Sequence, residues 1–545
     1  MKISLAQLNY TIGDFEGNAQ KMLEAVDIAK KEKADIICFA ELATCGYPPR
    51  DFLEFDDFIK RSDRVIDQLK AVSNGMAIVV GAPTVNPVIE GKDLFNSVYF
   101  LYEGEVKYVQ HKTLLPTYDI FDEYRYFEPN RSFGTVEFKG HRIALTVCED
   151  LWNLGNENPL YTICPMDQMM KDKPDIMINV SASPFDHEQS EKRIKILKEN
   201  VKKYQIPLFY VNHVGANTEI IFDGGSTVIS PNGKVYDEMD YFESYIKCFE
   251  LEDVLKNTME NRQKAGKFEK IQNALVLGIK DYFQKLGFKN AIIGLSGGLD
   301  SALTTVLAVK ALGKDHVRVL LMPSQFSSGH SIKDAVELAK NLDIEYDIIP
   351  INQIYEAYNQ TLEPYFMGAK FNVTEENLQA RTRGNLLMAL SNKFGHILLN
   401  TTNKSEMAVG YGTLYGDLSG GISVIGDVYK SDVFKLSWFI NKEKEIIPVN
   451  TIVKPPSAEL RPNQKDSDSL PDYEILDKIL FEYIENEKGP NEIINLGYDA
   501  NLVKRVLRMV NINEFKRYQT APVLRVSSKA FGIGRRVPIV ARYLS

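Results

Sequence analysis

Short apolar runs alternate with amphipathic stretches through the first half of the chain. Apolar runs of this length are typical of buried strands, and apolar positions spaced three and four apart are typical of helices. The pattern predicts strands at Ile3–Leu8, Ile36–Phe39, Ala77–Gly81, Ser97–Leu101, Ile143–Val147, Ile176–Val180 and Leu208–Val211, and helices that include Asn18–Lys31 and Glu188–Tyr204. Strands and helices that alternate in this way indicate an α/β fold.

A hairpin and a charged stretch close this first half. Residues 226–236, STVISPNGKVY, are expected to form the hairpin, with Pro231-Asn232-Gly233 as its turn. The Lys- and Glu-rich stretch Asn257–Lys270 has no apolar alternation and indicates a linker. A chain of 545 residues is too long for one core. We therefore predict two α/β domains, residues 1–255 and 271–545, joined by a linker at 256–270.

Residues 291–312, AIIGLSGGLDSALTTVLAVKAL, lead from an apolar strand through two glycines into a helix. Backbone N–H groups at such a helix start point into one small volume, where the helix dipole also favours negative charge. An ordinary glycine turn is the alternative interpretation. The pattern favours a polyphosphate site, and the residues expected to bind ATP there are Gly294, Leu295, Ser296, Gly297, Gly298, Leu299, Asp300 and Ser301.

Asp300 stands where a Walker loop has a lysine. A carboxylate beside phosphates repels them unless a divalent cation lies between, so Asp300 predicts Mg²⁺ bound together with ATP. The hexapeptide SGGLDS at 296–301 resembles the loop of the ATP-pyrophosphatase (N-type) synthetases. That resemblance implies a Rossmann-like domain with a parallel sheet. It also implies adenylation of a carboxylate or carbonyl, followed by displacement of AMP by an amine.

Composition narrows the class of protein. A hydrophobic share of 44% and a charged share of 25% are ordinary for a globular enzyme, and a net charge of −9 argues against a nucleic-acid partner. The five cysteines have no CxxC spacing, which favours a reducing compartment over a disulfide framework or a zinc site. Without a leader-like or membrane-spanning apolar run, we expect a cytoplasmic enzyme that needs no membrane.

Three reactive side chains follow apolar runs in the first half: Glu41, Lys112 and Cys148. Strand ends converge at one edge of an α/β sheet, so the three can meet there. Glu41 could then take the thiol proton, Cys148 attack an amide carbonyl, and Lys112 stabilise the oxyanion. The alternative interpretation is that Cys148 is only a small apolar side chain of the core.

Three motifs around these residues resemble those of the nitrilase/amidase superfamily: AELATCGYPPRD at 40–51, HKTLLPTYDIFDE at 111–123 and TVCEDLW at 146–152. The resemblance covers roughly residues 1–250 and implies an αββα sandwich with Glu41, Lys112 and Cys148 as its catalytic triad. It also implies that Tyr118 and Ser183 bind glutamine. Relatives that use glutamine tend to carry a basic residue six positions after that serine, whereas this chain has Gln189.

The pairing of an amidase half with an amine-consuming half resembles the glutamine-dependent NAD⁺ synthetase family. The stretches at 376–392, 403–417, 454–477 and 513–522 resemble it as well. The family resemblance implies that ammonia released from L-glutamine is channelled to a second site, where it converts deamido-NAD⁺ to NAD⁺ at the expense of ATP. It also implies a homo-oligomer formed through the second domain.

Transferred by position, the resemblance assigns Thr401 to ATP, and Asn377, Glu406 and Lys516 to deamido-NAD⁺. Asp300 and Glu406 would hold Mg²⁺. Many relatives have glycine where this chain has Thr402. There are three alternatives: a stand-alone carbon–nitrogen hydrolase, another adenylating amidotransferase, including a tRNA-modifying one, and a scaffold protein without catalytic activity. The intact SGGLDS and NKSE motifs argue against a second half that has lost its activity.

Overall fold

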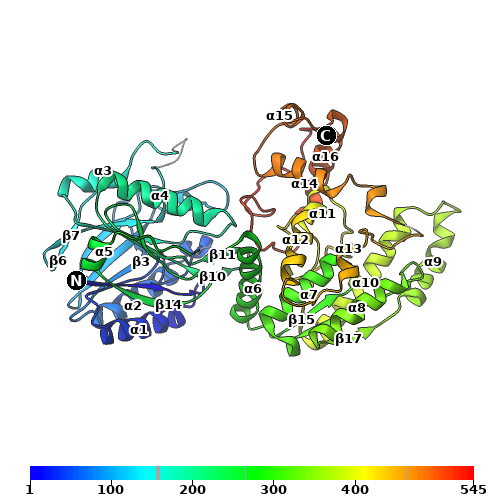
Figure 1. Ribbon diagram of the computed structural model, residues 1–545, viewed down its shortest axis with the longest axis horizontal. Coiled ribbons are helices and arrows are strands. Elements are labelled where there is room, and N and C mark those ends of the chain that lie inside the picture. Colours follow the sequence, from blue (N-terminus) through cyan, green and yellow to red (C-terminus); the bar gives the residue numbers. More distant parts are fainter. Residues whose placement is uncertain (155–159, 264, 463, 545) are drawn as a thin grey trace. The chain divides into compact units, whose positions relative to one another are not determined.

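The computed structural model describes residues 1–154, 160–263, 265–462 and 464–544. The chain forms two compact units, Met1–Ala265 and Gly266–Ser545 (Figure 1). Within the described residues, no helix is long and apolar enough to cross a bilayer.

The first unit is built on two six-stranded sheets. One sheet has the order β14-β1-β2-β3-β4-β5 and the other the order β13-β12-β9-β8-β7-β6. The strands of the first sheet are β1 (Lys2–Gln7), β2 (Ile36–Cys38), β3 (Ala77–Val85), β4 (Leu94–Tyr102), β5 (Glu105–His111) and β14 (Tyr245–Glu250). Those of the second are β6 (Val136–Phe138), β7 (His141–Val147), β8 (Ile176–Ser181), β9 (Leu208–Asn212), β12 (Thr227–Ile229) and β13 (Val235–Glu238). A separate hairpin pairs β10 (Val214–Asn217) with β11 (Ile220–Asp223).

The main core lies between these two sheets. Ile3, Ile36 and Phe100 from the first sheet share one buried cluster with Ile143 and Phe209 from the second. Helices cover the outer faces: in Figure 1, α1 and α2 lie below the strands, and α3 and α4 lie above them. These helices are α1 (Phe15–Lys31), α2 (Asp56–Ala71), α3 (Pro165–Met169) and α4 (Gln189–Tyr204), with α5 (Leu251–Lys256) following β14. This arrangement confirms the predicted αββα sandwich.

Local signals in the sequence explain these elements. The side chain of Asp14 accepts a hydrogen bond from the Gly17 N–H and caps α1, whose buried Ala19, Met22 and Val26 recur every three or four residues. In β2 every residue is buried, because both faces of its sheet are covered.

The second unit contains a five-stranded parallel sheet in the order β17-β16-β15-β18-β19. Its strands are β15 (Asn290–Gly294), β16 (Val317–Leu321), β17 (Glu345–Ile348), β18 (His396–Asn400) and β19 (Ile422–Ser423). The chain runs outward from β15 in one direction and resumes beside it at β18. The carboxyl end of β15 is therefore a topological switch point, where open α/β sheets bind ligands.

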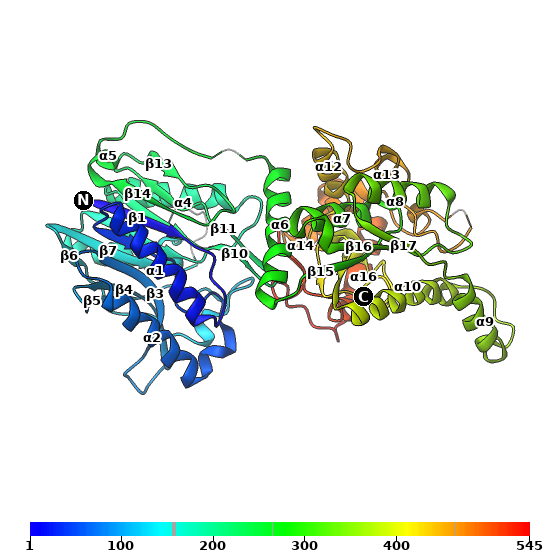
Figure 2. The same cartoon turned by 90° about the horizontal axis from the view of Figure 1, so that it is seen from below.

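Helices surround this sheet in both views (Figures 1 and 2). They are α6 (Lys267–Leu286), α7 (Leu299–Leu312), α8 (Gly329–Leu342), α9 (Asn352–Phe366), α10 (Val373–Phe394), α11 (Lys404–Val409), α12 (Lys430–Ile440), α13 (Val449–Val453), α14 (Tyr473–Ile484), α15 (Pro490–Asn495), α16 (Ala500–Ile512) and α17 (Glu514–Arg517). Helix α6 already begins at Lys267, inside the segment that the sequence indicates as a linker. The predicted parallel-sheet domain is confirmed.

Candidate active sites

The first unit brings Glu41, Lys112 and Cys148 together at strand ends. Glu41 lies in the turns that follow β2, while Lys112 comes directly after β5 and Cys148 directly after β7. All three side chains are buried, with Cys148 5% exposed. The convergence of strand ends expected from the sequence therefore occurs.

Hydrogen bonds fix the carboxylate of Glu41 on both oxygens. Oε1 accepts from Lys112 Nζ at 2.7 Å and from Asn96 Nδ2 at 2.7 Å, and Oε2 accepts from the Ala182 N–H at 2.9 Å. The turn that carries Glu41 lies directly on β3, where a Cβ at Gly81 would stand 2.5 Å from the Leu42 nitrogen. Only glycine allows that approach, so β3 contributes to the placement of Glu41.

A second buried carboxylate, Glu123, shares the same lysine. Lys112 Nζ donates to Glu123 Oε1 at 2.8 Å, and the Tyr47 hydroxyl donates to the same oxygen at 2.8 Å. Burial alone would lower the pKa of Lys112, but the charges of Glu123 and Glu41 raise it well above its usual range. The ammonium therefore stays protonated at neutral pH. Burial raises the pKa of Glu123 to about 7.

Cys148 occupies a strained backbone position at the end of β7. Its φ is 41°, in the left-handed region that side chains other than glycine rarely adopt. Strain of this kind persists only where the surrounding structure holds it. Asp150 supplies that support, because its carboxylate accepts from the N–H groups of Val147 at 3.1 Å, Thr113 at 2.9 Å and Leu114 at 3.0 Å. The Asp150 side chain thus hydrogen-bonds both to the turn that carries Cys148 and to the segment after Lys112.

The environment of Cys148 favours a thiol at rest. Burial raises its pKa well above the usual range, and the charge of Glu41 raises it further, while the Lys112 ammonium opposes the increase. A nucleophile at this position would therefore lose its proton during the reaction rather than before it.

Of the residues predicted to bind glutamine, Tyr118 contacts a further buried carboxylate, Glu149. The Tyr118 hydroxyl donates to Glu149 Oε1 at 3.0 Å, and the Tyr161 hydroxyl donates to the same oxygen at 3.1 Å. Ser183 follows Ala182, whose N–H binds Glu41, and its buried hydroxyl has no hydrogen-bond partner within the described residues. Gln189 is half-buried at the start of α4, where its N–H donates to Asp186 O.

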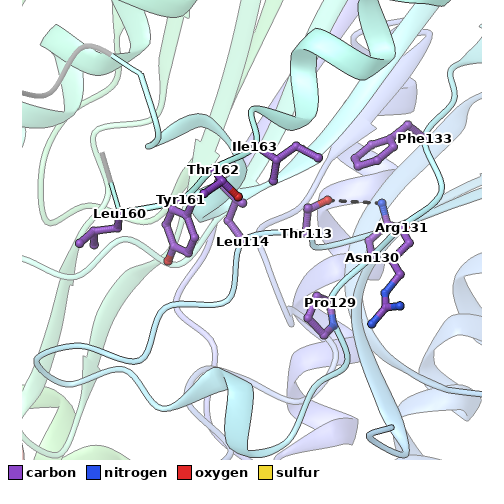
Figure 3. A pocket seen from close by; sticks show the side chains of 10 residues that line it. All are labelled: Thr113, Leu114, Pro129, Asn130, Arg131, Phe133, Leu160, Tyr161, Thr162 and Ile163. Carbon is purple, nitrogen blue, oxygen red and sulfur yellow. Dashed lines mark hydrogen bonds between the residues drawn. The ribbon is translucent and has the colours of Figure 1, made fainter. Parts of the chain in front are cut away.

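A cavity of about 470 Å³ adjoins this group (Figure 3). Its wall is formed by Thr113, Leu114, Pro129, Asn130, Arg131, Phe133, Leu160, Tyr161, Thr162 and Ile163. Thr113 and Leu114 are the residues that donate their N–H groups to Asp150, and Tyr161 reaches Glu149. Residues of the cavity wall are thus hydrogen-bonded to Glu149 and Asp150, which follow Cys148 in the chain.

In the second unit, the glycine turn at 295–298 joins β15 to α7. Gly297 has a φ of 83°, and a Cβ there would stand 2.2 Å from Ser331 O. Ser296 Oγ and Ser301 Oγ lie 3.1 Å apart and brace the turn from within. The first turn of α7 has no side-chain cap, because Gly298 stands at the N-cap position. Its N–H groups are therefore suited to bind an anion.

Asp300 and Glu406, the predicted metal ligands, face one buried ammonium. Asp300 Oδ2 accepts from Lys430 Nζ, which also lies 3.8 Å from Glu406 Oε1, and Asn403 Nδ2 donates to Asp300 Oδ1 at 3.1 Å. Burial and the charge of Asp300 raise the pKa of Glu406 well above its usual range. The carboxyl groups of Asp300 and Glu406 thus both face the Lys430 ammonium, and carboxylate oxygens are the donors that Mg²⁺ prefers.

The donor set is small. Within the described ranges, no three or more His, Cys, Asp or Glu side chains form a metal-binding group. Mg²⁺ beside nucleotide phosphates is usually held by one or two carboxylates together with phosphate oxygens. Asp300 and Glu406 fit that pattern.

The remaining predicted residues surround the segment after α11. Lys516 Nζ donates to Gly410 O at 2.7 Å and Gly412 O at 2.9 Å, and Asn377 Oδ1 accepts from Thr413 Oγ1 at 2.8 Å. Thr401 directly follows β18.

Thr402, which replaces a glycine of many relatives, causes no backbone strain, since it is not among the residues with positive φ. Its N–H donates to Asn400 Oδ1 at 3.0 Å.

Comparison with known proteins identifies the family. A family model described as carbon–nitrogen hydrolase matches residues 2–248, and one described as NAD synthase matches residues 271–520. The glutamine-dependent NAD(+) synthetase of Synechocystis sp. is 43% identical over 553 residues, covering 99% of each chain. The enzyme of the same name from Thermotoga maritima is 40% identical over 579 residues, covering 100% of this chain and 99% of its own. The chain belongs to the glutamine-dependent NAD⁺ synthetases.

A solved structure agrees with this assignment. The glutamine-dependent NAD⁺ synthetase from Acinetobacter baumannii, determined in complex with ADP, is 38% identical and superposes with a TM-score of 0.79. The match covers 99% of this synthetase and 98% of that chain. The cluster around Cys148 lies in the segment matched by the hydrolase model, and the glycine turn lies in the segment matched by the synthase model.

Sequence reasoning missed several buried residues of these clusters. Glu123 lies inside a motif that carries the resemblance, but it has no periodicity or spacing that would reveal a role. Glu149 follows Cys148 directly, so its charge is expected to raise the pKa of the thiol, but its contacts with Tyr118 and Tyr161 were not predicted. Lys430 lies 130 residues from Asp300, and only the tertiary fold brings the two together.

Proposed function

We propose that this synthetase converts deamido-NAD⁺ to NAD⁺ with ATP, using ammonia that residues 1–255 release from L-glutamine and residues 271–545 consume. The observation that carries the proposal is that one chain, aligned over its whole length with these relatives, contains a segment matched by the carbon–nitrogen hydrolase model and one matched by the NAD synthase model.

In the first cluster, Cys148 Sγ attacks the side-chain amide carbon of glutamine while Glu41 takes the thiol proton. The Lys112 ammonium lies beside Glu41 and stabilises the developing oxyanion. Glu41 returns the proton to the amide nitrogen, ammonia leaves, and a thioester remains on Cys148. Water then hydrolyses that thioester to glutamate with Glu41 as base.

Recognition of the amino-acid end of glutamine involves residues around Glu149. Its buried carboxylate follows the nucleophile directly, and phenol groups from Tyr118 and Tyr161 fix it. A fixed carboxylate suits the α-ammonium of the substrate. The unpaired hydroxyl of Ser183 supplies a further contact to glutamine. At Gln189 this chain has a neutral amide, where relatives have a positive charge that can bind the α-carboxylate.

Glutamine use should therefore weaken in acid. Burial raises the pKa of Glu149 to about 7, so the carboxylate is charged above that pH and neutral below it. We expect kcat/KM for glutamine hydrolysis to fall below pH 7, approaching roughly tenfold per pH unit. Measuring glutamate release from pH 5.5 to 8.5 tests this.

The variant Glu149→Gln separates this effect from the titration of Glu123, whose pKa is also about 7. Its kcat/KM should be lower by about tenfold or more at pH 8, with a shallower acid limb. An unchanged acid limb in this variant would show that Glu149 does not bind the ammonium.

In the second cluster, the nicotinate carboxylate attacks the α-phosphorus of ATP and pyrophosphate leaves. The turn at 294–301, with Thr401, binds the ATP phosphates, and Asn377, Glu406 and Lys516 bind deamido-NAD⁺. Asp300 and Glu406 would hold Mg²⁺, which neutralises phosphate charge. Ammonia then displaces AMP and gives the nicotinamide.

The test is the ratio of AMP formed to NAD⁺ formed. Incubation with deamido-NAD⁺, ATP and Mg²⁺ should yield one AMP per NAD⁺, with either glutamine or ammonium as nitrogen donor. With glutamine, glutamate should appear as well. Glutamate release without any NAD⁺ from either donor would instead identify a stand-alone amidohydrolase.

We also propose that the synthetase forms a homo-oligomer through its second unit. Helix α9 lies at the periphery of that unit in both views and buries only Tyr355 among its residues (Figures 1 and 2). The segment that it begins exposes Tyr365, Met367, Phe371 and Val373, each more than half accessible. Clustered apolar side chains of this kind mark an association surface.

In sedimentation at micromolar concentration, we expect a particle of at least twice the 61.8 kDa chain mass. Met367→Glu should shift the particle toward the monomer, because Met367 is 90% exposed and a buried unpaired charge opposes association. Leu496→Glu, at an exposed apolar position after α15, is the matched control. A monomeric native protein would refute the surface.

A further inference from the structure

Lys430 is a buried lysine placed between the two predicted metal ligands. It is the first residue of α12, and its side chain is 3% exposed. Its Nζ donates to Asp300 Oδ2 and lies 3.8 Å from Glu406 Oε1. The ammonium therefore stands where the two carboxylates converge.

Further groups complete this environment from neighbouring elements. Nζ lies 5.6 Å from the ring centroid of Tyr473 and 6.0 Å from that of Phe434. The Tyr473 hydroxyl donates to Asp466 at 3.0 Å, and that carboxylate adds to the negative charge around the lysine. Several carboxylates thus surround a single positive charge.

Another buried lysine of the same unit shows what a purely structural role looks like. Lys404 Nζ donates to Glu485 Oε1 at 2.9 Å, Ser527 Oγ at 2.7 Å and Lys529 O at 2.9 Å, and lies 2.9 Å from Asp427 Oδ1. In the described part of the chain, the ammonium of Lys430 donates one hydrogen bond, to Asp300. Its ammonium is held mainly by charge, and the charges are those of the predicted metal ligands.

We propose that Lys430 is an internal counter-ion that occupies the metal position until metal and nucleotide arrive together. This rests on the proposed function, because Asp300 and Glu406 act as metal ligands only there. A lysine ammonium and Mg²⁺ repel each other at such distances, so metal alone must displace the ammonium without offering it a new partner. ATP changes that balance, because its phosphates provide the released ammonium with negative charge beside the turn at 295–298.

The consequence is coupled binding. Metal without nucleotide should bind this synthetase weakly, and nucleotide should strengthen metal binding. Without the ammonium, metal alone should bind more tightly, and nucleotide should strengthen metal binding less. Lys430 is therefore a positioning residue for the metal as well as a stabiliser of the ligand-free site.

The experiment measures Mn²⁺ binding to the full chain by electron paramagnetic resonance, without nucleotide and without turnover. Lys430→Met should bind Mn²⁺ at least roughly tenfold more tightly than the native protein, since a competing charge is gone. Lys435→Met, on the same helix but solvent-exposed and paired with Asp432, is the matched control and should behave as native. Equal affinity in Lys430→Met and native protein would overturn the proposal.

A double variant locates the new site. Adding Glu406→Gln to Lys430→Met should abolish the gain, and a gain that survives would place the Mn²⁺ elsewhere and refute the proposal. Thermal unfolding identifies a variant that does not fold. In that case the native protein provides the test. With a non-hydrolysable ATP analogue present, its Mn²⁺ affinity should exceed the affinity of the analogue alone for Mn²⁺. No increase would overturn the proposal.

The failure of this proposal and the failure of the proposed function give different experimental results. Failure of the proposed function appears as absent NAD⁺ formation by the native protein, whereas failure of the counter-ion role appears only in the Mn²⁺ affinities.

Discussion

Cys148→Ala abolishes NAD⁺ formation from glutamine and leaves formation from ammonium nearly intact: this is the result we expect. The thiol is the proposed nucleophile of the first cluster, and its loss should lower the glutamine-dependent rate at least about a thousandfold. Ammonium bypasses that cluster, because the second cluster lies in a unit with its own sheet and core. The measurement is the initial rate of NAD⁺ formation with saturating glutamine or ammonium.

Two other cysteines provide matched controls. Cys45 is buried in the turns after Glu41, and Cys164 is half-buried before α3, so both can be replaced by alanine without touching the Glu41–Lys112 pair. Both variants should keep glutamine-dependent synthesis. Equal loss of both activities in Cys148→Ala would contradict the separation into two sites, and loss in Cys164→Ala alone would identify a different nucleophile.

Asp300→Asn should eliminate NAD⁺ formation with either nitrogen donor, by about 100-fold or more, while glutamine hydrolysis continues at a basal rate. The carboxylate stands in the first turn of α7, whose N–H groups are suited to bind phosphates. An amide there loses the charge that holds a divalent cation and also the charge that pairs with Lys430. Initial rates against Mg²⁺ concentration, with glutamate release followed in parallel, test the prediction.

Asp432→Asn is the control for this variant, because Asp432 lies on α12 near Lys430 yet pairs with the exposed Lys435 and Lys267. It should keep a normal synthetase rate. Glu406→Gln should resemble Asp300→Asn if both carboxylates hold one ion. A normal rate with a normal Mg²⁺ requirement in Asp300→Asn would refute the assignment of the glycine turn to metal-bound ATP.

Local pattern was sufficient to predict a strand that is buried on both faces and a helix with one buried face. The run Ile36–Phe39 predicts the strand found at Ile36–Cys38, and Glu188–Tyr204 predicts the helix found at Gln189–Tyr204. Strand β14, by contrast, was not predicted. It is only partly buried and pairs with β1 from the far end of the unit, so its existence depends on a long-range register.

The same distinction applies to the site residues. Glu41, Lys112 and Cys148 follow apolar strands, so the convergence of strand ends in a sheet predicts their meeting. Glu123 begins a short 3-10 helix and reaches Lys112 through the tertiary fold. Lys430 likewise depends on the packing of α12 beside α7, which no local pattern contains.

The crowding of carboxylates around Cys148 has a consequence for the life of the protein between turnovers. Thiolates, not thiols, react with peroxides and stray electrophiles, and exposed thiolates are the usual targets of oxidation. Here burial and Glu41 keep the proton on sulfur, and Lys112 is already engaged by two carboxylates. A nucleophile with these surroundings, as proposed for Cys148, would remain a thiol between turnovers and react slowly with oxidants until its substrate binds.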